Sequence, residues 1–213
     1  MPLEVHDQLT RGRLLPLSAV AACVEHLRGG GLAVLPTETG YMLAVDATDE
    51  AAIDAVYAAK GRPEAKPIHV AVASLEEIDR VTELPEEARR LCLEHMPGPL
   101  TLVGRSRGVV PDALTAHTGT LGARIPDTPA TLQILAAFRG PLTATSHNLS
   151  GEPPDPDPIQ AAGRLHPVGS GAIHVVVDPE AIKYDRPSTV VDTLVHPWDI
   201  LREGPVTILP LSG

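Results

Sequence analysis

The sequence predicts an α/β fold, or more loosely an α/β or α+β sheet protein, because apolar strand patterns alternate with helical patterns along most of the chain. Its 213 residues suit a single compact unit, and no internal repeat or low-complexity segment divides them. A hydrophobic content of 43% with only 2% aromatic residues indicates a globular core built mainly from Val, Leu, Ile and Ala. We therefore expect one domain that spans residues 1–213.

The N-terminal part is expected to form a short leader followed by a helix. Ser18 is a suitable N-cap, because apolar residues follow it at helical spacing. The three glycines at 29–31 are expected to end the helix.

Two apolar strands are expected next, at residues 32–35 and 41–45. Pro36 is expected to stop the first strand, and residues 37–39 then form a polar turn. The turn is thereby held between two rigid elements.

The following helix ends close to a cluster of positive charge. Asp49 can cap this helix, and Lys60 lies in its last turn on the face that carries the apolar residues, so the side chain is directed toward the core. For an isolated lysine, the favourable interaction with the helix dipole would be a sufficient explanation. Arg62 and Lys66 are so close that a local cationic site is the alternative.

The rest of the chain continues the same alternation, with loops at 106–122 and in the proline-rich, acidic segment 152–158. A short helix is expected from Leu75, with Ser74 and Glu77 as its capping box. The other expected elements are helices at 85–95, 128–138 and 159–165 and strands at 67–73, 100–103, 123–125, 141–145, 173–177, 188–192, 200–202 and 206–209.

The charge balance restricts the class of ligand. The net charge is -10, which argues against broad, non-specific binding to nucleic acid, because that affinity comes from Lys and Arg neutralising phosphates. A basic pocket inside an acidic protein suits a small anionic ligand better than a long polyanion. We expect no stable binding of nucleic acid.

The cysteines and the hydropathy pattern indicate the compartment. Cys23 and Cys92 each lie in an apolar helical pattern and are expected to be small buried hydrophobes instead of a disulfide pair or metal ligands. The N-terminus lacks a signal-peptide pattern, and no run approaches the roughly 18 apolar residues of a membrane span. We expect a cytoplasmic protein without a membrane partner.

Familiar catalytic motifs are missing from the sequence. It contains no GxxxxGK[ST] loop, no GxGxxG after a strand and no GxSxG. Its nine histidines include no HxxxH or HExxH pair, and no Cys/His set has zinc spacing, so no metal ligands are expected. What remains is a set of polar turns at strand ends, where α/β sheets bind ligands, although Ser, Thr and Asn also form turns for purely local reasons.

Six segments in order resemble one known family. They are LPTETGY, KGRPEAKP, MPGPLTLV, GARIPDTP, TSHNLSG, and PSTVVD together with LREG. These match the PTET-Y, KxR-P, PGP-strand, R-P-x, S-x-N-x-SG and closing motifs of the Sua5/YrdC/YwlC family of threonylcarbamoyl-AMP synthases. One match would be weak evidence, but six in the family's order and spacing are specific.

The resemblance implies a reaction and a fold. Members of the family convert L-threonine, bicarbonate or CO2, and ATP into threonylcarbamoyl-AMP and pyrophosphate, and the product passes to a transferase that makes the t6A base of tRNA. Mg2+ would enter with ATP and need no dedicated protein ligands. The fold implied is a single YrdC-like domain with a twisted mixed sheet, flanking helices and a concave, positively charged cavity.

The resemblance also implies roles for individual residues. Lys60 and Arg62 would act as the catalytic pair at the carboxylate, carbamate and phosphate end. The residues implied for threonine are Thr37, Thr39, Tyr41 and Arg124. Those implied for ATP are Lys60, Arg62, Ser146, Asn148, Ser188, Thr189 and Arg202.

Four residues depart from the family pattern and leave the amino-acid substrate open. Gly40 and Met42 flank Tyr41, and a methionine there would narrow the pocket or change its shape. Ala71 stands where many members have a histidine, although His69 points to the same face of the strand. His147 replaces the usual alanine and is expected to be a solvated turn residue or, alternatively, a contact near the reacting carbamate.

Two other functions remain as alternatives. A divergent paralogue would transfer a carbamoyl group through an adenylate to another acceptor, and it would differ in its preferred amino acid. A non-catalytic RNA-binding protein is the other alternative, but the acidic total and the five aromatic residues disfavour it.

Overall fold

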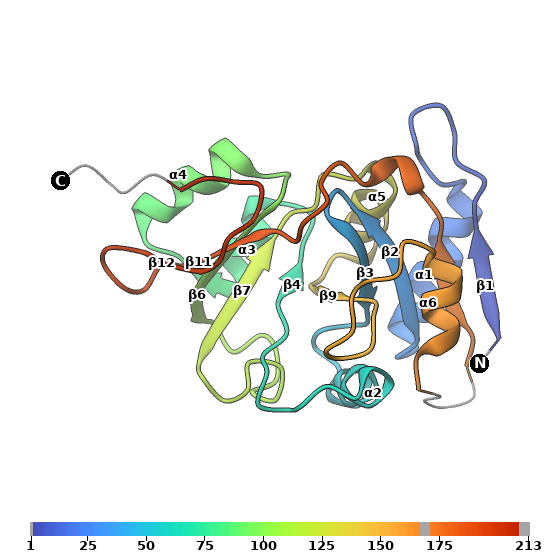
Figure 1. Ribbon diagram of the computed structural model, residues 1–213, viewed down its shortest axis with the longest axis horizontal. Coiled ribbons are helices and arrows are strands. Elements are labelled where there is room, and N and C mark those ends of the chain that lie inside the picture. The colour runs from blue at the N-terminus through green and yellow to red at the C-terminus, as the bar shows by residue number, and fades with distance from the viewer. Residues whose placement is uncertain (1, 167–170, 209–213) are drawn as a thin grey trace.

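The computed structural model describes residues 2–166 and 171–208 and has a mixed α/β fold, which confirms the predicted class (Figure 1). Its strands form two mixed sheets, so the sheet expected from the sequence is divided in two. The first sheet contains, in spatial order, β1 (Leu3–His6), β10 (Ile173–Val176), β2 (Leu32–Thr37), β3 (Gly40–Ala44) and β9 (Thr145–Ser146). The second contains β12 (Asp199–Arg202), β11 (Thr189–Asp192), β6 (Leu100–Ser106), β7 (Thr120–Arg124), β4 (Val70–Ala71) and β8 (Leu142–Thr143), with β5 (Thr82–Glu83) paired to β6.

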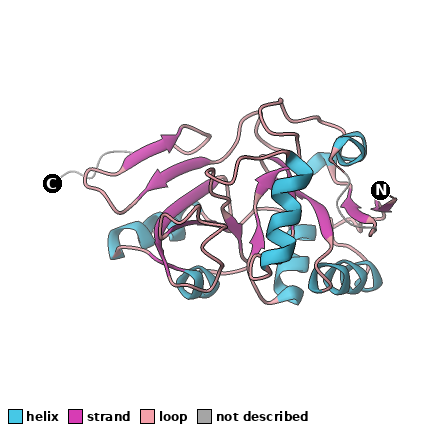
Figure 2. Ribbon diagram, turned by 90° about the horizontal axis from the view of Figure 1, so that it is seen from below, coloured by secondary structure: helices cyan, strands magenta, loops and turns pink. Residues whose placement is uncertain are grey.

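Helices border the strands of both sheets (Figures 1 and 2). They are α1 (Leu17–Arg28), α2 (Glu50–Lys60), α3 (Leu75–Val81), α4 (Glu86–His95), α5 (Pro129–Phe138) and α6 (Pro158–Arg164), with a 3-10 turn at Pro179–Ala181. None of the helices in the described part of the chain is both long and apolar enough to cross a membrane.

The alternation of side chains along the first sheet creates two apolar faces. In β2, Ala33 and Leu35 pack in the core beneath α1 and α5, whereas Leu32 and Val34 belong to the core on the opposite face. That second core also contains residues of α6, α2 and the second sheet, such as Ile53 of α2. One apolar core therefore extends across both sheets.

The helix before the basic cluster forms as predicted. The Asp49 carboxylate accepts hydrogen bonds from the backbone N–H groups of Ala51 and Ala52, which caps α2. Gly61 ends it in the left-handed conformation at φ 57°. Lys60, in the last turn, is only 2% exposed, so the prediction that it points toward the core is confirmed.

Pro36 does not end the first strand, contrary to the prediction. β2 continues through Pro36 to Thr37, where Pro36 pairs with Tyr41 of β3. The pairing of β2 with β10 stops at Val34, so beyond that residue β2 has one neighbouring strand in the ladder. A proline lacks a backbone N–H, and an edge position tolerates that loss.

Several other boundaries also differ from the prediction. Helix α1 has Pro16 at its N-cap in place of Ser18, because the helix begins at Leu17. Strand β7 begins at Thr120, within the predicted loop, and β1 occupies the predicted leader. The expected strand at 206–209 is absent from residues 206–208, and Leu209 lies outside the described residues.

The predicted strand 141–145 is in fact the crossing between the two sheets. Leu142 and Thr143 pair with β4 in the second sheet, and Thr145 and Ser146 pair with β3 in the first. The Thr143 hydroxyl accepts a hydrogen bond from Val45 N at 3.1 Å and donates to Leu43 O at 3.2 Å. Thr143 therefore belongs to the second sheet, and its side-chain hydrogen bonds connect that sheet to the first.

Candidate functional site

A cavity of about 570 Å³ lies where the two sheets meet, and strands of both sheets contribute to it. Its size is within the range of small-molecule sites. Nine of the eleven predicted site residues line it, and these are Thr37, Thr39, Tyr41, Arg62, Arg124, Ser146, Asn148, Ser188 and Arg202. The two that do not line it are Lys60 and Thr189.

The lining of the cavity contains mostly basic and hydroxyl-bearing polar side chains. It includes five basic residues, Arg62, Lys66, Arg124, Arg186 and Arg202, and one acidic residue, Asp185. Arginine presents a planar fork of donors that matches carboxylates and phosphates, and lysine acts as a point charge. The lining therefore supplies the donors for anionic ligands, and the overall positive potential of the cavity stays a prediction.

Arg124 is fixed by a buried ion pair. Its guanidinium donates to the Glu38 carboxylate and, through Nη1, to Thr39 Oγ1 at 3.2 Å. Glu38 is completely buried, and its other oxygen accepts from Asp127 N at 2.8 Å. Burial lowers the pKa of Arg124, and Glu38 opposes that effect. Among the described residues Arg124 Nε is a buried donor without a hydrogen-bond partner.

The turn between β2 and β3, at residues 37–40, is stabilised by hydrogen bonds that the hydroxyl groups of Thr37 and Thr39 form within it. Thr37 Oγ1 donates to Gly40 O at 2.6 Å and lies 3.2 Å from Thr39 Oγ1. Gly40 has a φ of 118°, a conformation that a side chain would strain. The Tyr41 hydroxyl accepts a hydrogen bond from Asp178 N at 3.1 Å, and burial raises the pKa of this phenol.

Arg62 and Arg202 are oriented by backbone carbonyls and, for Arg202, also by the Ser188 hydroxyl. Arg62 donates through Nε to Lys66 O at 3.2 Å and through Nη2 to Pro67 O at 2.9 Å. Arg202 donates through Nε to Ser188 O and through Nη2 to Ser188 Oγ, both at 2.9 Å. Each guanidinium is held in place and keeps further N–H groups that these bonds do not use.

Lys60 supports the wall of the cavity from behind. Its ammonium donates to the carbonyl oxygens of Ser146 and Asn148, the latter at 2.5 Å, and so joins the end of α2 to the turn after β9. Burial lowers the pKa of Lys60 from 10.5 to about 7, and the Arg62 charge adds to this effect. Asn148 Oδ1 is likewise a buried acceptor without a hydrogen-bond partner in the described part of the chain.

The lowered pKa of Lys60 predicts a pH-dependent stability. Between about 7 and 10.5 the unfolded chain holds a proton on Lys60 that the folded chain has lost, so stability should rise with pH across this interval. Below about 7 both states are protonated and this contribution is constant. Urea unfolding of the wild type and of Lys60→Met at several pH values measures it. Equal pH slopes for the two proteins would contradict the assignment.

Thr189 and His147 have structural roles in this geometry. Thr189 is 1% exposed, and its hydroxyl donates to Val206 O at 2.8 Å and accepts from Val206 N. His147 is 1% exposed, so the expectation of a solvated turn residue is wrong. It packs edge-on against the Tyr41 ring at 5.5 Å, with Nδ1 3.2 Å from Tyr41 O, and it is not among the residues that line the cavity.

Several lining residues were not assigned a role from the sequence, notably Lys66, Thr101 and Arg186. His69, which was noted only as a neighbour of Ala71, also lines the cavity. Burial lowers the pKa of His69 to about 4, with further lowering by Arg202, Arg62 and Arg124, so this imidazole is neutral near pH 7. Gly122 makes room for it, because a Cβ there would lie 2.6 Å from His69 Cδ2. Met42 lines the cavity as well.

Fold and cavity together define a class: an α/β protein whose two mixed sheets enclose a site suited to small anionic ligands. A family model, Sua5_yciO_yrdC, described as "Telomere recombination", matches residues 25–204. The chain belongs to this Sua5/YciO/YrdC family. The resemblance drawn from the six sequence segments is thereby confirmed.

Curated relatives and solved structures are similar over most of the chain. The threonylcarbamoyl-AMP synthase of Pyrococcus abyssi is 35% identical over 179 residues, which are 84% of this chain and 52% of that protein. A Mycobacterium leprae relative is 35% identical over 208 residues, 97% of this chain and 89% of its own length. The chain thus spans about half the length of the first relative and most of the second.

Two solved structures have the same fold. The P. abyssi Sua5 structure complexed with L-threonine has a TM-score of 0.83 at 29% identity and covers 93% of this chain and 57% of that one. Escherichia coli YciO has a TM-score of 0.77 at 24% identity, with coverage of 96% and 95%. The second likeness concerns the fold alone.

Proposed function

We propose that this protein is an L-threonylcarbamoyladenylate synthase, a nucleotidyltransferase that supplies the t6A modification of tRNA. The observation that carries the proposal is that nine of the residues implied by the family resemblance line one cavity. The P. abyssi relative bears the name of this activity, and its structure was solved with L-threonine.

The proposed reaction has two steps. The threonine amine first adds to CO2 with loss of a proton, or condenses with bicarbonate with loss of water, to give a carbamate. A carbamate oxygen then attacks the α-phosphorus of ATP, which forms threonylcarbamoyl-AMP and releases pyrophosphate. Threonine carboxylate, carbamate and triphosphate repel one another in water, so fixed cations that hold them together lower the barrier by positioning and by charge stabilisation.

The geometry supports a division of tasks among the lining residues. We assign the binding of the threonine substrate to Thr37, Thr39 and Arg124. The ion pair with Glu38 holds the Arg124 guanidinium in place. We assign ATP phosphates and the carbamate to Arg62, Arg202 and Ser188. Ser146 and Asn148 would then contact the nucleotide from the turn that Lys60 supports.

Lys60 receives a changed role in this proposal. Because it is buried and bonded to two carbonyls behind the cavity wall, we propose that it positions the 146–148 turn and acts on the substrates only through that turn.

Mg2+ would enter the site bound to the phosphates of ATP. The lining offers one carboxylate, Asp185. A single carboxylate fits Mg2+, because this ion keeps several water ligands and takes most of its other ligands from the phosphates of the substrate. The ion would neutralise phosphate charge.

We further propose that the reaction takes place in the cytoplasm, in line with the two free cysteines. A t6A transferase would receive the product.

Pyrophosphate release in the presence of ATP, Mg2+, threonine and bicarbonate tests the proposal. Release should require both threonine and bicarbonate, and mass spectrometry should detect threonylcarbamoyl-AMP. A panel of other amino acids and carbamoyl phosphate in the same assay addresses the paralogue, since a better substrate than threonine would overturn the assignment. Tight RNA binding without any pyrophosphate release would favour the RNA-binding alternative.

A further inference from the structure

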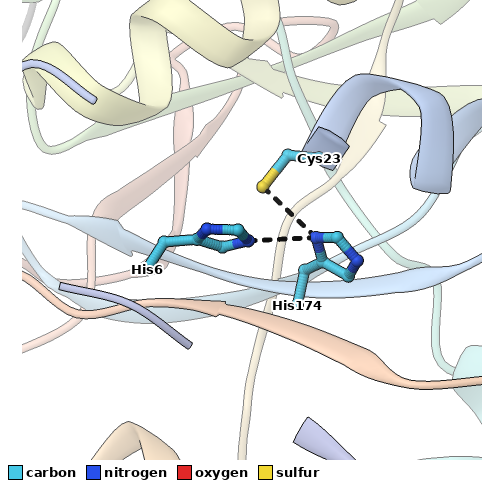
Figure 3. A group of neighbouring side chains, drawn as sticks. All are labelled: His6, Cys23 and His174. Carbon is cyan, nitrogen blue, oxygen red and sulfur yellow. Dashed lines mark hydrogen bonds between the residues drawn. The ribbon is translucent and has the colours of Figure 1, made fainter. Parts of the chain in front are cut away.

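A second group of reactive side chains lies away from the cavity, where α1 packs on the edge of the first sheet. Figure 3 shows His6 from β1, Cys23 from α1 and His174 from β10, with their heteroatoms directed toward one another. One ligand atom from each lies within 4.8 Å of the others. None of the three lines the cavity, so the proposed synthase reaction does not use them.

The strand pairing explains how the group forms. β1 runs parallel to β10 with Glu4 opposite His174, so Glu4, His6 and His174 emerge on the same face of the sheet. Val176, two residues beyond His174, belongs to the core beneath α1, which identifies this face as the one that α1 covers. Cys23 is completely buried within the same core.

The distances are close to those of a metal site. His6 Nε2 lies 3.1 Å from His174 Nδ1, and Cys23 Sγ lies 3.6 Å from the same nitrogen. With Zn–N bonds of about 2.0 Å and Zn–S bonds of about 2.3 Å, tetrahedral geometry places two nitrogens about 3.3 Å apart and a nitrogen and a sulfur about 3.6 Å apart. The third pair, His6 and Cys23, has ligand atoms within 4.8 Å of each other, and an ion fits once these two atoms approach to about 3.6 Å.

The orientation of His174 is fixed by its neighbours. Its Nε2 lies 3.2 Å from Glu4 Oε2, so the proton of the neutral ring resides there and the Nδ1 lone pair faces Cys23. The ring of His26 stacks on it at 4.1 Å between centroids and 16° between planes. His26 is in turn held by Leu32 O, 3.0 Å from its Nε2. A carboxylate behind a ligating histidine is the usual support of a protein metal site.

We propose that His6, Cys23 and His174 bind one divalent transition-metal ion of the zinc class, with Glu4 orienting His174. Two imidazole nitrogens and one thiolate form a donor set suited to a borderline-soft ion. On binding, the Cys23 thiol releases its proton to solvent and the metal–sulfur bond forms. The hydrogen bond between the two histidines breaks, the proton that it holds moves to the far nitrogen of His6, and water occupies the fourth position.

The bound ion would have a structural effect. It would join β1, the outer strand of the first sheet, to β10 and to α1. A ligand that binds only the folded chain stabilises it by mass action. Binding should therefore raise the melting temperature and leave the cavity unchanged.

Zn2+ titration of the metal-free full-length protein tests the inference, with no readout from synthase activity. We expect one equivalent of tightly bound Zn2+ in the wild type and in the control Cys92→Ser, whose cysteine is also buried, in α4. Cys23→Ser and His6→Gln should each weaken binding at least tenfold. With Co2+ as the probe, a thiolate charge-transfer band should appear in the wild type and be lost in Cys23→Ser.

Circular dichroism establishes that each variant is folded. His6 is at the rim of the group with 10% of its side chain exposed, so His6→Gln should fold even if Cys23→Ser does not. The inference is overturned if the wild type binds no stoichiometric Zn2+, or if a folded Cys23→Ser or His6→Gln variant binds it as tightly as the wild type. A melting temperature that Zn2+ raises equally in all variants would also overturn it.

Discussion

Replacing Glu38 with methionine is expected to lower the free energy of unfolding by about 3–5 kcal/mol, because it leaves the buried Arg124 charge without its partner. Glu38 is completely buried, and Arg124 is 7% exposed. The substitution also removes the acceptor of Asp127 N. Chemical denaturation measures the loss. We expect it to be among the largest effects of any single polar substitution in the described part of the chain.

The double variant Glu38→Met/Arg124→Met separates the charge effect from loss of packing. It should be more stable than Glu38→Met alone, because no unpaired charge remains buried. Asp79→Ala is the control, since it removes the partner of Arg89 from a pair that is 2.6 Å long and whose side chains are 46% and 35% exposed. That loss should stay below about 1 kcal/mol. If Glu38→Met costs no more than the control, the buried pair does not have the importance assigned to it.

Replacing Arg62 with alanine is expected to lower kcat/KM for threonylcarbamoyl-AMP formation by about 10²- to 10³-fold, the usual loss for a fixed donor that stabilises transition-state charge. Arg62 lines the cavity, and its position is set by the carbonyls of Lys66 and Pro67. Arg62→Lys should recover part of the activity, because it restores the charge without the planar fork. Steady-state pyrophosphate release measures both variants.

Arg90→Ala is the control for the loss of an arginine. Arg90 is exposed on α4 and is not part of the cavity lining, so its replacement should leave kcat/KM unchanged. A normal kcat/KM in Arg62→Ala together with a reduced melting temperature would mean that Arg62 only braces the 62–67 loop. The catalytic assignment would then be withdrawn.

Local patterns predicted much of the scaffold. The N-cap at Asp49 and the burial of Lys60 follow from interactions within one helix, and the structure confirms them. Five of the six sequence segments supplied the nine predicted residues that line the cavity, because these segments lie at strand ends or in turns where the sheets meet. Interactions between residues that are close in the chain, such as helix caps and short motifs, can be read from the sequence directly.

Long-range packing explains the errors. An apolar run such as 141–145 predicts a strand but does not say which sheet receives it, and here Ala144 lies between a strand in each. His147 lies in a polar turn, and its contacts with Tyr41, 106 residues earlier in the chain, are part of what buries it. The contact of Lys60 with the 146–148 turn is similarly remote.

The same limit applies to the candidate zinc ligands. Zinc motifs are recognised by short spacings between Cys and His residues. Cys23 and His174 are separated by 151 positions and meet only because α1 packs over β10. A search by spacing therefore returns no zinc site, whereas the folded chain presents a Cys–His group.

The pairing of β1 with β10 also has a consequence for synthesis of the protein. His6 and His174 lie side by side but are separated by 168 residues in the chain, and β10 separates β1 from β2 in the sheet. A ribosome adds about 5–20 residues per second, so β2 and β3 wait on the order of ten seconds for β10 to appear. β11 and β12 of the second sheet follow still later. Both sheets are therefore completed only after Arg202 has been synthesised, and such non-local pairing makes folding slow.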